Sequence, residues 1–197
     1  MREELLNTGY ISFDIDNELL NKIYEESLNN ESFNLIKVSH NSIAQDTNVN
    51  KQNFHQHEKL KNNFIQDDNL EQIWHWKVDK SDTINQLLYG VFKDYYDYSF
   101  DELNIMASVT LFTQGCFINE HNDGKDPNRI AGILIYLNKD YDATNGGCLI
   151  LENETKIVPE YGRVVIIDYT QHTIQHAVTT VLENDRKAIC AFIHKKQ

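Results

Sequence analysis

Cysteine is scarce in this sequence. It has three cysteines, Cys116, Cys148 and Cys190, and no two of them form a Cys-x-x-Cys pair. An odd number at such wide spacing argues against a disulfide framework and against a structural zinc site. All three lie in apolar runs, where a cysteine usually behaves as a small buried hydrophobic residue.

Long hydrophobic stretches are also missing. No apolar run approaches the ~20 residues that a membrane-spanning helix needs. The first six residues, MREELL, lack the apolar core of a signal peptide. We therefore expect no membrane partner and a cytoplasmic location, where thiols stay reduced. Proline occurs only twice, and the sequence has neither an internal repeat nor a low-complexity tract.

Positive charge is in short supply as well. The 18 lysines and arginines face 30 acidic residues, which gives a formal net charge of -12. A surface of this sign repels phosphate backbones, so we expect no nucleic-acid partner. It would suit a neutral or basic substrate, but we expect a solvated acidic surface with no partner.

The length of 197 residues fits one domain with a full core. We expect residues 1–197 to form a single domain in which two parts differ in pattern. Residues 1–103 form a helical and loop support region, and residues 104–197 form a β core. The sequence is silent on the oligomeric state.

The support region combines amphipathic helices with polar loops. Residues 9–13 predict a short strand, and Asn17 can cap a helix that follows it. A second helix is expected after Ser81 and Asp82, where apolar residues recur at helical spacing. Residues 40–70, rich in Asn, Gln and Asp, predict a long irregular segment, and such segments are often functional or disordered.

The second part changes to short runs of Val, Ile, Phe, Tyr and Thr, separated by Gly or Asn/Asp clusters. Eight short strands after a helical lead-in predict a mainly β fold, a double-stranded β-helix (jelly roll) with the N-terminal helices packed on one sheet. The expected strands are 105–112, 117–121, 130–137, 147–151, 155–158, 163–168, 174–181 and 187–194.

Four side chains in this part carry the chemistry. His121 and Asp123 form a His-x-Asp, and on an extended strand such residues point to one side. With His176 they would supply two imidazoles and one carboxylate, a set that suits non-haem Fe(II) and leaves positions open. Arg186 offers a planar cationic fork suited to a dicarboxylate. Singly, each has a plainer explanation, as a solvated loop, a core histidine or a surface ion pair.

A family resemblance strengthens the set. Residues 135–142, IYLNKDYD, and residues 146–149, GGCL, lie between the His-x-Asp and the distal histidine. With the basic residue ten positions after His176, they closely resemble the Fe(II)/2-oxoglutarate-dependent dioxygenases of the prolyl 4-hydroxylase type. The resemblance covers about residues 104–194 and is closest to the hypoxia-inducible-factor prolyl hydroxylase branch.

The resemblance implies a role for particular residues. It places Fe(II) on His121, Asp123 and His176. It places the far carboxylate of 2-oxoglutarate on Arg186 and Tyr136, for which a core aromatic is the plainer explanation. The catalytic residues would then be the metal ligands themselves.

Three further residues are candidates for the site. Arg129 takes the place of an arginine near the substrate entrance of the family, and Leu149 that of an apolar residue near the cosubstrate. Family members often have a Tyr-x-x-Gly before the His-x-Asp, but this sequence has Phe112 there and so lacks the phenol hydroxyl. We expect Thr110, with Ser108 as the alternative, to supply a contact to the cosubstrate in its place.

The resemblance also implies a reaction. The enzyme would use Fe(II), 2-oxoglutarate and O2, with ascorbate as a candidate reductant, and would hydroxylate a C–H bond while releasing succinate and CO2. The favoured substrate is a prolyl residue in a peptide or protein. A free amino acid or a small natural product remains the alternative. Asp123 favours hydroxylation over halogenation, since halogenating relatives keep that position small.

Other functions would account for fewer of these candidate site residues. A jelly-roll binding module without enzymatic activity would not need the four side chains together. A zinc hydrolase could use two histidines and a carboxylate, but it would not need Arg186 and Tyr136. A nucleic-acid demethylase would carry a second arginine where this sequence has Phe192.

Other histidines are weaker candidates for metal binding. His55 and His57 form a His-x-His pair in a polar stretch without a third ligand nearby. His172 is expected in a loop near the mouth of the barrel, and His194 in the last strand. Trp74 and its neighbours form an aromatic cluster that we expect to pack on the sheet, with substrate stacking as the alternative.

Overall fold

The computed structural model describes residues 2–28, 34–37, 72–77, 82–112, 114–123 and 126–196, with backbone alone in 34–37 and 72–77. Its helices and strands lie in the following order: α1 (Arg2–Thr8), β1 (Tyr10–Asp14), α2 (Glu18–Ser27), β2 (Asn34–Lys37), β3 (Gln72–Lys77), α5 (Asp82–Phe92), β4 (Leu103–Phe112), β5 (Ile118–His121), β6 (Arg129–Tyr136), β7 (Leu149–Leu151), β8 (Lys156–Ile157), β9 (Arg163–Asp168), β10 (His176–Val178) and β11 (Arg186–Lys195).

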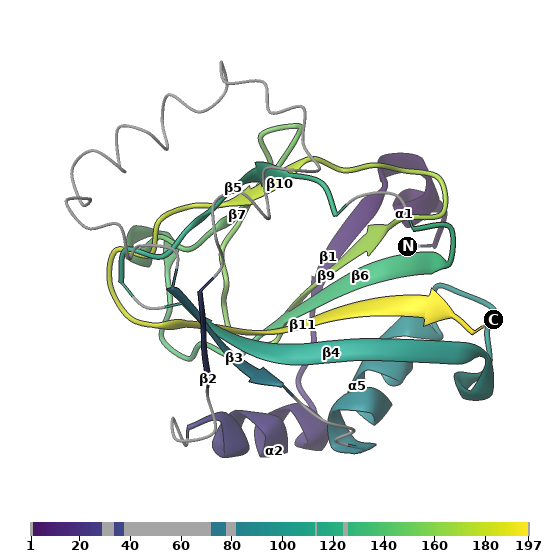
Figure 1. Cartoon of the computed structure of the whole chain (residues 1–197), viewed down its shortest axis with the longest axis horizontal. Coiled ribbons are helices and arrows are strands. Elements are labelled where there is room, and N and C mark those ends of the chain that lie inside the picture. The colour runs from purple at the N-terminus through teal and green to yellow at the C-terminus, as the bar shows by residue number, and fades with distance from the viewer. Residues whose placement is uncertain are drawn as a thin grey trace.

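Two antiparallel sheets face each other, which confirms the predicted jelly-roll class. The larger sheet has seven strands in the order β1-β9-β6-β11-β4-β3-β2, and the smaller has four in the order β5-β10-β7-β8. Figure 1 shows α2 and α5 on the face of the larger sheet that points away from the smaller one. None of the helices in the described ranges is long and apolar enough to cross a membrane.

Alternation along the central strands explains the two packed layers. On β11, Ile189, Ala191 and Ile193 belong to the core cluster that includes residues of α2 and α5. The neighbouring positions Ala188 and Cys190 pack with the cluster between the two sheets. Because strand side chains alternate in direction, one strand serves both layers. The same alternation sends every second residue of β11 toward the interior between the sheets.

The first part of the chain contributes more strand than its sequence pattern indicates. β1 pairs with β9, and β3, which contains Trp74, pairs with β4. The sequence predicted β1 but described the remainder of 1–103 as helix and loop. Pairing with the edge of β4 supplies backbone hydrogen bonds that no local pattern encodes. The predicted irregular segment 40–70, including His55 and His57, lies outside the described residues.

Loss of packing between the helices and the larger sheet should be costly. Ile135 is fully buried on β6, where it pairs with Val164 of β9 and Ile189 of β11. We expect Ile135→Ala to lower the free energy of unfolding by about 2–5 kcal/mol, because the truncated side chain would leave a cavity in the buried core. Urea denaturation followed by circular dichroism measures this change.

The matched control lies on the same sheet. Met106 on β4 is 57% exposed, so Met106→Ala should change the free energy of unfolding by no more than about 0.5 kcal/mol. Equal losses for the two variants would show that the cluster around Ile135 does not carry the stability of the sheet.

Candidate active site

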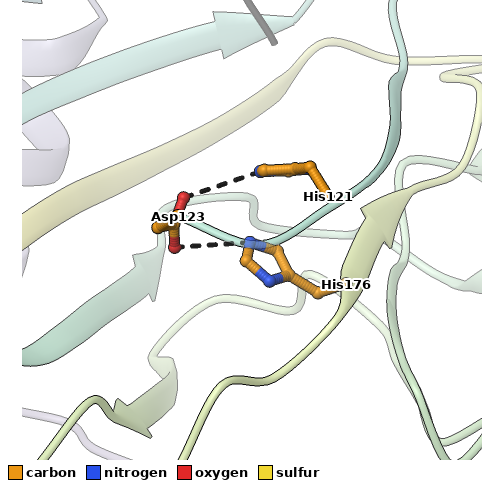
Figure 2. Close-up of side chains that lie close together, drawn as sticks. All are labelled: His121, Asp123 and His176. Atoms are coloured by element: carbon orange, nitrogen blue, oxygen red, sulfur yellow. Dashed lines mark ion pairs between the residues drawn. The ribbon is translucent and has the colours of Figure 1, made fainter. Parts of the chain in front are cut away.

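Two histidines meet because their strands are neighbours. β10 pairs with β5 in a register that sets His176 opposite His121, and their ring centroids are 4.3 Å apart. Asp123 lies two residues beyond His121, where β5 has already ended. Strand alternation therefore does not place Asp123, contrary to our expectation. Figure 2 shows its carboxylate facing both rings.

The distances make the three side chains a candidate metal-binding group. His121 Nε2 lies 3.6 Å from Asp123 Oδ1, and His176 Nε2 lies 3.6 Å from Asp123 Oδ2. One ligand atom from each residue lies within 4.8 Å of the others. The sequence predicts all three as ligands, and the structure brings them together.

Both imidazoles are oriented by backbone carbonyls. His121 Nδ1 donates to the carbonyl of Asn119 at 2.8 Å, and His176 Nδ1 donates to that of Ile174 at 3.1 Å. Because a carbonyl can only accept, each Nδ1 carries the proton. In the neutral ring each Nε2 keeps a lone pair directed at the carboxylate, which is the tautomer that a metal requires.

The electrostatics favour the metal-binding charge states. Burial lowers the pKa of His176 and keeps the ring neutral. Burial alone would raise the pKa of Asp123, but hydrogen bonds and charge from His121, His176 and Tyr169 hold it well below its usual range. Burial also opposes protonation of His121, yet Asp123 raises the pKa of this histidine above its ordinary value. A bound cation would replace that proton.

A cavity of about 190 Å³ opens beside the three ligands. It reaches from the metal-binding group to Arg186, so one small molecule could touch both. The lining is mostly apolar, as in many sites for small ligands. Its walls are formed by Thr110, Phe112, Ile118, His121, Asp123, Gly132, Ile133, Leu134, Leu149, Ile167, Tyr169, His176, Val178, Arg186, Cys190, Ala191 and Phe192.

Arg186 is a buried cation at the far end of this cavity. It is 1% exposed, and its Nε donates to the carbonyl of Gly147 at 2.8 Å. Its Nη2 lies 3.4 Å from the hydroxyl of Tyr136, and its guanidinium lies 4.9 Å from the ring centroid of Phe112 and 5.0 Å from that of Tyr136. Among the described residues it forms no ion pair with a carboxylate. Since an unpaired buried charge is costly, this end of the cavity is matched to an incoming anion.

Thr110 and Leu149, which we predicted near the cosubstrate, both line the cavity. The Thr110 hydroxyl donates to the carbonyl of Ala188 at 3.2 Å, and its oxygen also lies 3.5 Å from Cys190 Sγ. With its proton engaged, it cannot replace the absent phenol as a hydrogen-bond donor. A carboxylate offers no proton, so this geometry favours packing over a direct hydrogen bond.

Arg129 lies next to the metal-binding group rather than on the cavity wall. Its Nη1 donates to the backbone carbonyl of Asp123. Its guanidinium lies 4.2 Å from the ring centroid of Phe192 and 5.5 Å from that of Tyr169. The residue predicted at the substrate entrance thus also holds a metal-binding residue.

Two other histidines stay apart from this group. His172 lies outside the strands, as predicted, and its Nε2 contacts the carbonyl of Leu6 at 2.8 Å, against α1. His194 lies in β11, also as predicted, and its Nε2 is 3.3 Å from Asp126 Oδ2. Both side chains therefore bond to other parts of the fold and not to the three candidate ligands.

Sequence reasoning missed Tyr169. Its hydroxyl donates to Asp123 Oδ2, and the pKa of this phenol is raised by burial and by the charge of Asp123. The sequence shows an aromatic residue directly after β9, in a stretch that reads as a turn. Only the pairing of β9 with β6 brings that residue to the metal-binding group.

The donor set fits Fe(II). Two neutral imidazoles and one carboxylate, with positions left open toward a cavity, are the ligand set of non-haem Fe(II) oxygenases. The buried Arg186 fits the distal carboxylate of 2-oxoglutarate because a guanidinium binds carboxylates through two parallel hydrogen bonds. Fold and site together define a class of iron-dependent oxygenase.

Comparison with known families agrees with this class. Residues 106–194 match the 2OG-Fe(II) oxygenase superfamily, and the chain thus contains a domain of that superfamily. This confirms the predicted use of Fe(II) and 2-oxoglutarate. No curated protein sequence matches the chain.

Several solved structures share the fold. A Pseudomonas putida prolyl-4-hydroxylase superposes with a TM-score of 0.67 at 14% identity, covering 100% of this chain and 97% of that one. A prolyl hydroxylase from Trichoplax adhaerens, in complex with a hypoxia-inducible-factor peptide fragment, superposes with a TM-score of 0.68 at 16% identity, covering 98% of this chain and 87% of that one. HygX from Streptomyces hygroscopicus, with nickel, 2-oxoglutarate and hygromycin B bound, superposes with a TM-score of 0.60 at 10% identity, covering 100% of this chain and 88% of that one. At these identities the likeness shows the fold alone.

Proposed function

We propose that the protein is a hydroxylase in which His121, Asp123 and His176 hold Fe(II), while Arg186 and Tyr136 hold the far carboxylate of 2-oxoglutarate. One observation carries the proposal. A cavity connects a group of two imidazoles and a carboxylate with a buried guanidinium that has no anionic partner among the described residues. A zinc hydrolase could use the two histidines and the carboxylate, but neither a hydrolase nor a binding module has an evident use for the buried guanidinium beside them.

When bound, iron and cosubstrate supply the oxidising chemistry: substrate C–H, 2-oxoglutarate and O2 give substrate C–OH, succinate and CO2. The chain's own residues bind, orient and exclude water. Leu149, Val178 and Ile167 make the cavity wall apolar, which keeps water from the reacting centre. Arg186 and Tyr136 fix one end of the cosubstrate, so that its other end is directed at the three ligands.

We further propose a prolyl residue in a peptide or protein as the substrate. The motif IYLNKDYD, which resembles the prolyl hydroxylases, and the similarity to two prolyl hydroxylase folds support this choice. Arg129 at the edge of the site would contact the substrate. A small molecule is the second candidate, because HygX, with hygromycin B bound, shares the fold at similar coverage. Ascorbate as reductant and the cytoplasmic location remain predictions.

Two measurements test the function. Anaerobic addition of Fe(II) and 2-oxoglutarate should produce the visible charge-transfer band of a keto acid chelated to iron. Proline-bearing peptides and free amino acids are then screened for substrate-dependent succinate release and for the mass of one added oxygen atom. A protein that develops no band would not be an oxygenase of this kind. A band with oxygen added only to small molecules would favour the second candidate.

A further inference from the structure

We propose that Tyr169 is a positioning residue that sets the orientation of the Asp123 carboxylate for metal binding. The inference rests on the proposed function, because it concerns the same metal site. Its starting point is that Asp123 lies beyond the end of β5, so no strand pairing fixes it. A ligand on such a segment needs support from other elements.

Asp123 is held at both its side chain and its backbone. The hydroxyl of Tyr169 donates to Oδ2, and Nη1 of Arg129 donates to the backbone carbonyl. Each oxygen also faces one histidine at 3.6 Å, Oδ1 the Nε2 of His121 and Oδ2 the Nε2 of His176, and the phenol donates only to Oδ2. The two carboxylate oxygens are thus distinguished, with Oδ1 available to a metal and Oδ2 restrained by the phenol.

Tyr169 is itself fixed by the larger sheet. Its backbone N–H donates to the carbonyl of Ile130 at 2.9 Å, next to the paired strands β6 and β9. Its ring covers Gly132, where an added Cβ would come within 2.9 Å of the ring carbon Cε2. The guanidinium of Arg129 lies 5.5 Å from the centroid of the same ring. The position of the hydroxyl therefore follows from the core of the sheet.

This arrangement has a clear consequence for metal binding. A hydrogen bond to the non-coordinating oxygen of a carboxylate fixes the plane of the ligand and selects the oxygen that binds. Loss of such a partner typically weakens metal binding by about 10- to 100-fold. A residue that only packed against Gly132 would have no such effect when its hydroxyl alone is removed.

The experiment removes the hydroxyl and keeps the ring. Co(II) alone is the probe, titrated anaerobically into the full-length apoprotein and followed by its visible d–d absorption. We expect Tyr169→Phe to raise the Kd for Co(II) by about 10- to 100-fold and to alter the shape of the band. Tyr161→Phe is the matched control, since that phenol contacts Asn21 on the surface, and it should leave both unchanged.

A second variant tests the same hydroxyl without removing it. Gly132→Ala should displace the ring of Tyr169 and weaken Co(II) binding in the same direction. Gly132→Ala also tests the positioning role of Tyr169 if the Tyr169→Phe protein fails to fold. Wild-type affinity and an unchanged spectrum in the folded Tyr169→Phe protein, or in Gly132→Ala when it alone folds, would overturn the inference.

Failure of this inference can be told from failure of the proposed function. If Asp123→Ala loses Co(II) binding while Tyr169→Phe retains it, the metal site stands and only the positioning role is wrong. If Asp123→Ala binds Co(II) as well as the wild type does, the metal site itself is wrong.

Discussion

Asp123→Ala is expected to abolish metal-dependent turnover. It removes the single anionic ligand and leaves two neutral imidazoles facing an apolar cavity. Affinity for Fe(II) should fall by more than the ~100-fold seen when an outer hydrogen-bonding partner is lost. The charge-transfer band with 2-oxoglutarate should vanish, and no succinate should form.

Metal content after anaerobic loading and dialysis measures the change directly. The matched control is Asp126→Asn, which alters a carboxylate three residues further along that pairs with His194 and not with the metal-binding group. It should retain the metal. Unchanged metal content in the Asp123→Ala protein would contradict the assignment of this ligand.

Arg186→Met is expected to weaken cosubstrate binding strongly while it spares the metal. Truncating one partner of a buried, hydrogen-bonded charge pair costs about 2–5 kcal/mol, or roughly 30- to several-thousand-fold in affinity. The Kd for 2-oxoglutarate, followed by the same anaerobic band, should rise by at least about 30-fold. Arg186→Lys should recover only part of this, since an ammonium lacks the planar fork.

Arg186→Met should weaken cosubstrate binding without lowering the stability of the apoprotein. Without cosubstrate, Arg186 is a buried cation with no carboxylate partner among the described residues. An apolar side chain of similar length should therefore leave the Tm of the apoprotein unchanged or raise it. Arg163→Gln is the control, because that arginine pairs with Asp14 and Glu160 away from the cavity. An Arg186→Met protein with normal 2-oxoglutarate affinity would remove the basis of the proposed cosubstrate site.

Local patterns in the sequence determined most of the β core. The run 163–168 alternates between the two packed layers and is β9 residue for residue. The predicted strand 174–181 is longer than β10, which covers only His176–Val178 and whose pairing with β5 shifts register between these two residues. β3 was not predicted, since it depends on a neighbour that is distant in the chain.

The sequence by itself also determined which residue types could form the site. His121, Asp123, His176 and Arg186 are recognisable because Fe(II) and a carboxylate demand those donors. Tertiary structure alone decided how they meet. The β5–β10 register sets the histidines side by side, and the β6–β9 pair brings Tyr169 to Asp123. Residue chemistry is local information, whereas strand register and the packing of one side chain on another depend on segments far apart in the chain.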